Sequence, residues 1–171
     1  MAILTNYYQV KSAIDFSNQS DIWIEFAKDT PWTDETKPDS ENPAITDLDS
    51  SQIFVKSNSL ILLYPAKDTD SDDNVIIYKN NRWIPSGVDD AYKNNATFVL
   101  LSYKIDAGTT DNFTWRQTGI RKGTTPVEAG SKTLLKPSEV SDKGKLLAFD
   151  NHVPQNYSND TVATVQYLME F

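Results

Sequence analysis

The segment that decides the fold reads Asp21-Ile22-Trp23-Ile24-Glu25-Phe26-Ala27-Lys28. Its large apolar side chains recur at every second residue, with Ile22, Ile24 and Phe26 on one side of the alternation. Successive side chains of an extended chain point to opposite faces, so this period of two predicts a half-buried β-strand.

The chain around this strand has the same character. Eight further segments are short, rich in β-branched and aromatic residues and bounded by turn residues. They are residues 52–56, 59–64, 74–79, 82–84, 97–105, 112–120, 145–149 and 161–171. Many short strands favour a sandwich or barrel over a parallel α/β fold. Because 171 residues suit one sizeable core, we predict a mainly β fold, a single-domain antiparallel β-sandwich over residues 1–171.

Two strand pairs look like local hairpins. Residues 75–78 and 83–84 flank Asn80-Asn81, whose short polar side chains tolerate the left-handed backbone of a tight turn. Residues 97–105 precede residues 112–120 across a short turn segment, and we expect those two strands to pair as well.

The N-terminal segment differs from the rest. Within residues 1–20, apolar residues fall at spacings of three and four, which predicts a short amphipathic helix. They are Leu4, Tyr7, Tyr8, Val10 and Ile14.

Residues 29–51 form a predicted long loop. Periodicity is lost there, and Pro31, Pro38 and Pro43 stand among acidic and small polar residues. Loops of about twenty residues are uncommon inside compact domains and usually serve a function or dock a partner. Proline also fixes φ, so a proline-rich segment loses less entropy on docking.

Composition excludes several classes of partner. Sixteen Lys and Arg against 24 Asp and Glu give a formal charge of −8. Phosphate backbones and anionic bilayers attract basic proteins, so we expect neither nucleic acid nor membrane as a partner. The chain has no cysteine, which rules out disulfides and thiolate metal sites. With no leader-like start or long apolar stretch, we expect synthesis in a cytoplasm.

Catalytic and metal motifs are also missing from the sequence. His152 is the single histidine, beside Pro154, and a turn or surface role is the expected one. Residues 68–73 place acidic side chains at alternate positions like the start of a calcium loop, but Asp73 stands where glycine is needed and Lys79 where a bidentate Glu is needed. We therefore predict an acidic turn, with weak adventitious cation binding as the alternative, and no catalytic residue, cofactor or metal site.

The four tryptophans raise a question of packing or recognition. Trp23, Trp83 and Trp115 lie in predicted strands, where core or interface packing is the expected use. Trp32 lies in the long loop and its role stays open. A sugar-stacking platform is the alternative for the set.

Four segments together resemble one known family, the small wedge-type structural proteins of contractile-phage baseplates. The first joins the strand at residues 22–28 to a Thr-Pro-Trp and acidic-proline loop at residues 30–38, and the second is the aromatic-Arg-Gln-x-Gly strand at residues 113–120. The others are residues 134–146, beginning Leu-Leu-Lys-Pro, and residues 150–154 ahead of the last strand. The four segments follow one another along almost the whole chain.

This resemblance implies a non-enzymatic subunit of the virion tail baseplate, made in the cytoplasm of the host bacterium. It further implies burial against other baseplate or tail proteins and against copies of itself, as a homodimer or higher homo-oligomer. The interface candidates are Pro31, Trp32, Asp34, Glu35 and Pro38. Two alternatives are a carbohydrate- or receptor-binding β-sandwich at the tail tip and a glycosidase that uses two carboxylates.

Overall fold

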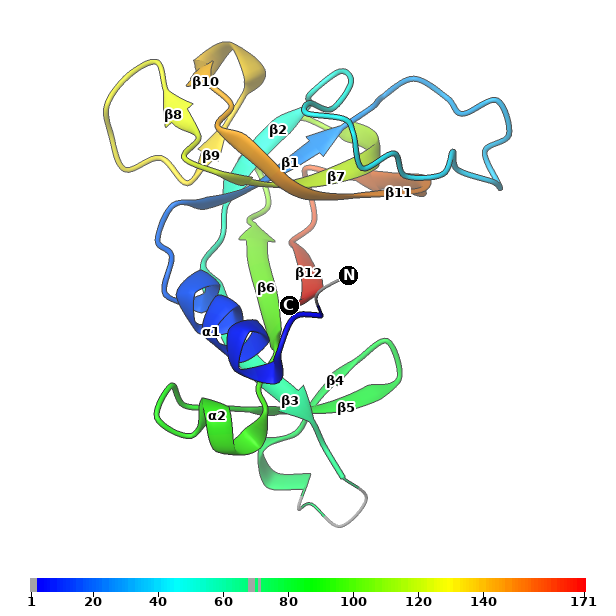
Figure 1. Cartoon of the computed structure of the whole chain (residues 1–171). Coiled ribbons are helices and arrows are strands. Elements are labelled where there is room, and N and C mark those ends of the chain that lie inside the picture. The colour runs from blue at the N-terminus through cyan, green and yellow to red at the C-terminus, as the bar shows by residue number, and fades with distance from the viewer. Residues whose placement is uncertain (1–2, 68–69, 71) are drawn as a thin grey trace. The chain divides into compact units, whose positions relative to one another are not determined.

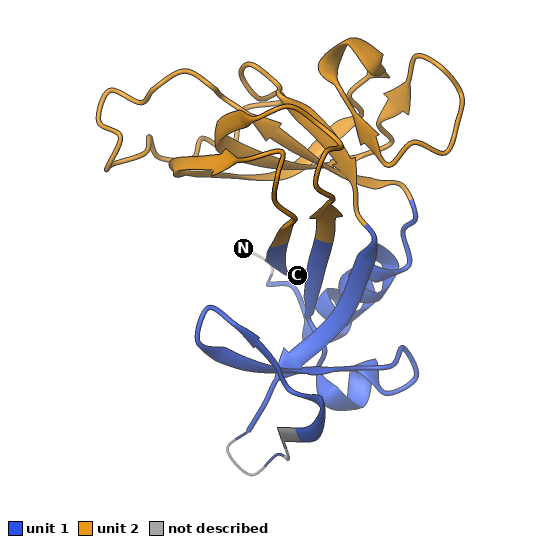
Figure 2. Cartoon of the chain, turned by 180° about the vertical axis from the view of Figure 1, so that it is seen from behind, with its two compact units in different colours: residues 1–20, 58–102, 166–171 blue, residues 21–57, 103–165 orange. Residues whose placement is uncertain are grey.

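The computed structural model describes residues 3–67, 70 and 72–171 (Figure 1). The fold divides into two compact units, neither continuous in sequence (Figure 2). Unit 1 comprises Met1–Ser20, Asn58–Ser102 and Gln166–Phe171, and unit 2 comprises Asp21–Ser57 and Tyr103–Val165. The single domain expected from chain length stays a prediction.

Unit 2 contains a five-stranded antiparallel sheet in the order β11-β7-β1-β2-β9. These strands are β1 (Ile22–Ala27), β2 (Ile53–Lys56), β7 (Phe113–Lys122), β9 (Leu134–Leu135) and β11 (Lys145–Tyr157). A two-stranded sheet pairs β8 (Thr125–Pro126) with β10 (Val140–Asp142), which follows the 3₁₀ helix η2 (Pro137–Glu139).

Strand β1 lies at the centre of the large sheet and is buried at all six positions. Ile24 and Phe26 face a core that also contains Tyr103 and Ile105, with Val165 packed against it. Those last three residues belong to the ends of β6 and β12 that lie in unit 2, so strands form a second layer over this face of the sheet. The mainly β, antiparallel, sandwich-like fold predicted from the sequence is thus confirmed.

Unit 1 contains the other sheet, in the order β12-β6-β3-β5-β4. Its elements are α1 (Asn6–Ser17), β3 (Ser59–Pro65), η1 (Asp72–Asn74), β4 (Ile76–Tyr78), β5 (Asn81–Pro85) and α2 (Ala91–Asn94), together with parts of β6 (Phe98–Ile105) and β12 (Ala163–Glu170). Leu63, Trp83 and Leu100 form its core cluster.

The predicted N-terminal helix is confirmed, but of the apolar residues expected on its buried side only Val10 is fully buried. Helix α1 starts at the cap Thr5, whose Oγ1 accepts the Tyr8 N–H at 3.4 Å. It buries Val10, Ala13 and Phe16, which lie three residues apart on one helical face. The exposed apolar residues are instead Leu4, just before the helix, and Tyr7 and Tyr8 within it.

One predicted hairpin is confirmed, with its turn at Lys79-Asn80 and not at the expected Asn80-Asn81, and the other is wrong. Strands β4 and β5 pair through Tyr78 and Asn81, and Lys79 and Asn80 have φ values of 46° and 64°, as a two-residue turn of the primed type requires. Strands β6 and β7 lie in different sheets, because β6 pairs with β3 whereas β7 pairs with β1 and β11.

Three tryptophans pack as expected. Trp23, Trp83 and Trp115 are all buried, each beside a core cluster of its own unit. The predicted acidic turn at residues 68–73 falls partly on Asp68, Thr69 and Ser71, which lie outside the described residues.

Candidate interface: the long loop on the sheet of unit 2

Residues 28–52, here called the long loop, connect β1 to β2 without a helix or strand of their own. The two ends of the loop are tied together. The Lys28 N–H donates to the carbonyls of Asp49 at 2.7 Å and Ser50 at 3.2 Å, and the Gln52 N–H donates to the Phe26 carbonyl at 2.7 Å. Lys28 and Ser50 have φ values of 57° and 49°, so the chain turns sharply at both ends of this neck.

Trp32 anchors the first half of the loop. Its side chain is only 6% exposed, and its Nε1 donates to the His152 carbonyl of β11 at 2.9 Å. The Lys28 ammonium lies 4.6 Å from the centre of the indole ring, within the range of a cation–π contact. The Trp32 ring therefore packs against its own chain.

An ion pair fixes the next turn of the loop. Arg116 of β7 donates to both carboxylate oxygens of Glu35, from Nε to Oε2 at 2.9 Å and from Nη2 to Oε1 at 2.5 Å. Its Nη1 also donates to the Asp29 carbonyl at 2.5 Å. The hydrogen bond from Arg116 lowers the pKa of Glu35 from its ordinary value, against the opposing effect of burial. The bidentate geometry holds the loop in one position.

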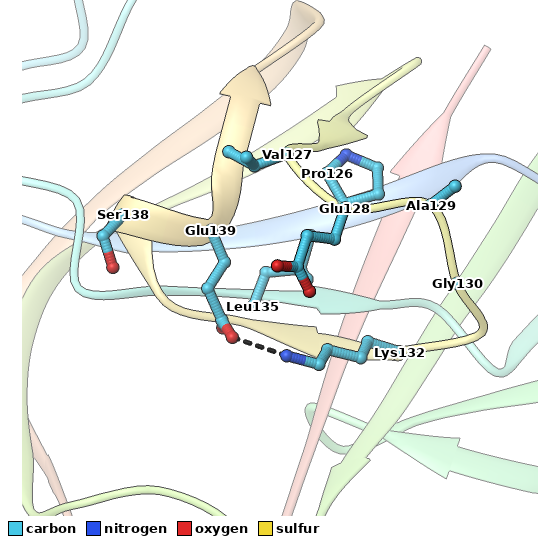
Figure 3. Close-up of a pocket in the computed structure, with 9 residues that line it drawn as sticks. All are labelled: Pro126, Val127, Glu128, Ala129, Gly130, Lys132, Leu135, Ser138 and Glu139. Carbon is cyan, nitrogen blue, oxygen red and sulfur yellow. Dashed lines mark hydrogen bonds and ion pairs between the residues drawn. The ribbon is translucent and has the colours of Figure 1, made fainter.

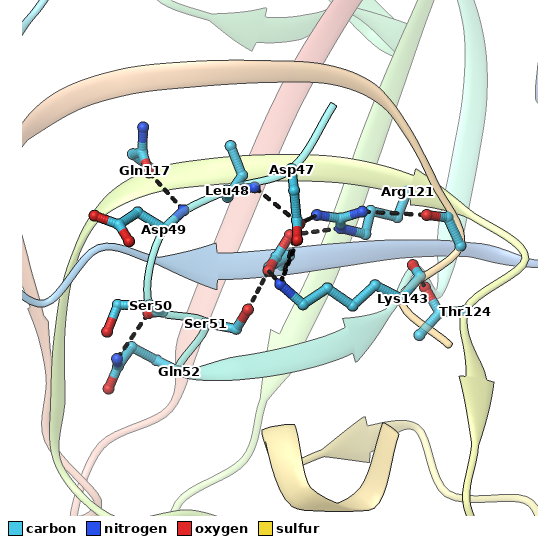
Figure 4. Close-up of polar contacts among 12 residues, drawn as sticks. Asp47, Leu48, Asp49, Ser50, Ser51, Gln52, Gln117, Arg121, Thr124 and Lys143 are labelled. Atoms are coloured by element: carbon cyan, nitrogen blue, oxygen red, sulfur yellow. Dashed lines mark hydrogen bonds and ion pairs between the residues drawn. The ribbon is translucent and has the colours of Figure 1, made fainter. Parts of the chain in front are cut away.

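A second charged cluster lies beneath the end of the loop (Figure 4). Glu25 of β1 has a fully buried side chain, and Arg121 of β7 donates to it from Nε at 2.5 Å. Arg121 also pairs with Asp47 of the loop, and Ser51 donates a hydrogen bond to Glu25. The Lys143 ammonium lies 2.9 Å from Asp47 and 3.7 Å from Glu25. Two carboxylates and two cations thus balance in charge across four segments.

Asp47 is held in its charged form. Partial burial raises the pKa of this carboxyl, but hydrogen bonds from Lys143 and from the Leu48 N–H, together with the charge of Arg121, lower the pKa by more. The net pKa is below the ordinary value, so Asp47 keeps its ion pairs at neutral pH.

Close packing completes the attachment. Gly119 of β7 lies opposite Glu25, and a Cβ atom at position 119 would come within 2.7 Å of Leu48 and 2.9 Å of Leu146. Leu48 is 5% exposed. Both atoms are ends of leucine side chains, so a larger residue at position 119 would make these side chains move, and the glycine lets Leu48 pack directly on the sheet.

The contacts with the long loop explain the residue types in the sequence motif at residues 113–120. Arg116 and Gly119 hold the loop as described, and the Gln117 side chain accepts the Asp49 N–H at 3.4 Å. Thr118 contacts Nε2 of His152 at 3.1 Å. The side chains of this motif therefore hold the long loop on the sheet.

The five predicted interface residues have different surroundings. Trp32 is buried and Glu35 is tied to Arg116, while Pro31 and Asp34 are exposed and Pro38 is half-buried. Their role in an interface stays a prediction. Sequence reasoning missed the cluster of Glu25, Asp47, Arg121 and Lys143. A signal was available, since Glu25 interrupts a strand whose other residues are apolar.

Two kinds of feature are absent from the described part of the chain. Residues 3–67, 70 and 72–171 contain no group of three or more His, Asp or Glu side chains placed to hold a metal ion. None of the helices within those residues is long and apolar enough to cross a bilayer.

Comparison with known proteins identifies the family. The model of the family described as baseplate wedge 3 tail fiber network component matches residues 1–171. Virion protein 3 of Enterococcus phage phiEF24C is 29% identical over 172 residues, which cover 99% of this chain and 94% of that protein. The predicted resemblance to baseplate wedge proteins and the predicted location in the virion tail are confirmed. The chain belongs to the baseplate wedge 3 tail fiber network component family.

Proposed function

We propose that this chain is a non-enzymatic structural subunit of the baseplate, which joins other tail proteins by protein–protein contacts through its long loop. Membership of the baseplate family supports the structural role. The observation that carries the docking role is the attachment of the loop to the sheet by Trp32, by the Glu35–Arg116 pair and by the Arg121 cluster. A loop held in one conformation loses little entropy when a partner binds.

The outer side of the loop supplies the docking groups. Pro31 and Asp34 are exposed, as are Asp39 and Glu41 further along. A partner with a basic surface would meet a rigid acidic and proline-rich ridge there, and complementary charge speeds and directs such encounters.

Asp39→Lys tests this docking role. The Asp39 side chain is exposed and makes no hydrogen bond or ion pair within the part of the chain that the structure describes, so its reversal leaves the fold intact. Asp89→Lys is the matched control, an exposed carboxylate in unit 1 with the same change of charge. We expect normal melting of both variants and reduced incorporation into baseplates for Asp39→Lys alone. Equal incorporation of the two would remove the loop from the interface.

Self-association is a further part of the proposal. Around α1, unit 1 exposes apolar and aromatic side chains, with Ile3 86%, Leu4 63%, Tyr7 66% and Tyr8 54% exposed. Exposed Tyr is enriched at interfaces. We expect light scattering of the purified chain to give a dimer or larger species, and Tyr8→Glu to shift it toward the monomer. A monomeric wild-type chain at high concentration would contradict self-association of the free protein.

One hollow favours a second candidate function, carbohydrate binding. It has a volume of about 560 Å³ and is lined by Asp29, Asn112, Phe113, Thr114, Asn156, Tyr157 and Ser158. Phe113 and Tyr157 stack at 5.3 Å between ring centres, and the lining offers amides, hydroxyls and a carboxylate, which suit sugar hydroxyls. A glycan array with the wild type and Asn156→Ala tests it. Absence of any bound glycan would leave the structural role alone.

A further inference from the structure

A small hollow lies between the end of β8 and the segment that contains β9 and η2 (Figure 3). Its volume is about 200 Å³. The fully buried Leu135 and the ring of Pro126 form its apolar part, and Val127 stands at its edge with 61% of its surface exposed. A space of this size suits one long side chain.

The walls of the hollow are fixed by hydrogen bonds and packing. The Val127 N–H donates to the Glu139 carbonyl at 2.8 Å, and Val140 pairs with Pro126 across the two-stranded sheet. Leu135 belongs to a core cluster with Trp23 and Phe54. The hollow is therefore built into unit 2 and needs no rearrangement to receive a ligand.

The charges at the rim are not balanced. Glu139 accepts hydrogen bonds from the Lys132 ammonium at 2.6 Å and from the Lys136 N–H at 2.8 Å. These contacts, the Lys132 bond first, lower the pKa of Glu139 and keep it ionised. Glu128 lies beside the hollow with its carboxylate exposed, and it makes no hydrogen bond or ion pair with any described residue (Figure 3). The charge of Glu128 also acts on the Lys132 ammonium, which is already bonded to Glu139, so two carboxylates share one ammonium over an apolar floor.

We propose that this hollow receives a lysine or arginine side chain from a different tail protein, with the aliphatic stem on Val127 and Leu135 and the cation at Glu128. Both side chains combine an apolar stem with a charged end, which matches an apolar floor beside a carboxylate that has no ion pair of its own. An acidic side chain would be repelled by Glu128. A purely apolar side chain would remove water from Glu128 without giving its charge a partner. The chain carries a charge of −8, so a basic partner segment is also attracted over a distance, an attraction that a second copy with the same negative charge does not offer.

This inference rests on the proposed structural function, since the ligand is a neighbouring subunit. Charge reversal tests it in particles of the phage that encodes this chain. We expect Glu128→Arg to reduce the copies of this protein per particle about tenfold or more, and Glu128→Gln to reduce them less, because like charges at an interface repel strongly. Glu170→Arg is the matched control, an exposed glutamate of β12 with the same change of charge, and it should incorporate normally. Unchanged melting temperatures of all three purified variants establish that they fold.

A photo-crosslinking residue at position 127 identifies the chemistry of the partner. Mass spectrometry of intact particles should find it joined to a segment of another tail protein that carries Lys or Arg at the crosslinked position or next to it. Normal incorporation of Glu128→Arg, a crosslink to a second copy of this chain or a crosslink to a segment without a basic residue would each overturn the inference. Absence of the wild-type chain from particles would instead overturn the structural function itself, so the two failures are distinct.

Discussion

Arg121 is 2% exposed and binds two carboxylates, one from β1 and one from the long loop. Taking such charges out of water is costly, and the cost is repaid only while every partner is in place. The side chain therefore links the burial of Glu25 to the position of Asp47.

Arg121→Met should destabilise the chain by about 3–5 kcal/mol, because it leaves Glu25 charged, buried and short of its closest cation. Urea denaturation measures the change. Lys104→Met, which breaks the exposed pair with Asp106, should change stability by about 0.5 kcal/mol or less. The double variant Glu25→Gln with Arg121→Met should be more stable than Arg121→Met alone. A loss no larger than that of the Lys104 variant would show that the pair is not buried as described.

Gly119→Ala should cost about 1–3 kcal/mol, because the added methyl group would overlap Leu48 and Leu146. Gly87→Ala is the control, since nothing lies within 4 Å of a Cβ atom at that position. Shortening Leu48 to Ala in the Gly119→Ala background should recover part of the loss. Thermal melting of the three variants checks this, and equal melting of Gly119→Ala and Gly87→Ala would contradict the close contact.

Trp32→Ala should lower the melting temperature of the isolated chain, because truncation of a buried aromatic side chain costs about 3–5 kcal/mol. Loss of the indole also removes the hydrogen bond to the His152 carbonyl. Trp32→Phe keeps an aromatic ring in most of this space without the N–H and should lose less. Normal melting of Trp32→Ala together with lost assembly would instead mean that the ring acts on a partner.

The long loop is held in place by residues that are far from it in the sequence. Its residues have no periodicity, yet Trp32, Glu35, Asp47 and Leu48 each reach a defined place on β7 or β11. Stability of this element depends on ionised carboxylates, and this gives it a dependence on pH that the apolar core lacks.

Acid should release the loop. The pKa values of Glu35 and Asp47 are lowered in the folded state, so their contribution to stability is complete above the unfolded pKa of about 4 and is lost as the pH falls through the folded values. Pepsin cleavage within the loop should therefore accelerate as the pH falls from about 4 to about 2. The double variant Glu35→Gln with Asp47→Asn should be cleaved readily throughout this range. A wild-type cleavage rate that fell with acid, after correction for pepsin activity, would contradict this account.

Strands with clear alternation were predictable, and short or interrupted ones were not. The pattern Ile22, Ile24, Phe26 led directly to β1, although the strand is buried on both faces and not half-buried as expected. Strands β8, β9 and β10 have two or three residues each, too few to show any period. Strand β11 continues past Pro154 to Tyr157, beyond the predicted end at residue 149. It lies at the sheet edge and its register shifts between residues 151 and 155, which is where proline is tolerated in a strand.

The candidate site was predictable only in part. The proline-rich loop was identified from composition, but its attachment depends on pairs such as Glu25 with Arg121, which are 96 residues apart. Alternation along a strand indicates which face a residue occupies and says nothing about which distant charge it meets. The wrong hairpin between residues 97–105 and 112–120 has the same cause, because nearness in sequence favoured a pairing that the sheets do not use.

At the scale of the whole molecule, two strands pass from one unit into the other. Strand β6 contributes Leu100 to the core of unit 1 and Tyr103 to that of unit 2, and β12 contributes Leu168 and Val165 in the same way. Loss of structure in either unit therefore disturbs strands that the other also needs.

We accordingly expect the chain to unfold in a single cooperative transition, as a single domain would. Differential scanning calorimetry should give one peak whose calorimetric and van't Hoff enthalpies agree. The Arg121→Met variant should shift the whole peak without splitting it. Two separated peaks for the wild type would show that the units are independent domains.

The neck of the long loop has a consequence for how this family can vary. Because Lys28 and Asp49 are joined by a backbone hydrogen bond, the chain leaves and re-enters the sheet at nearly one point. Residues could be added to or removed from the middle of the loop without altering the register of β1 against β2. The cost of lengthening a closed loop rises only slowly, by about 0.6 kcal/mol for each doubling. The loop can therefore diverge in length and content among related phages, and be exchanged between them, while the scaffold beneath it stays the same.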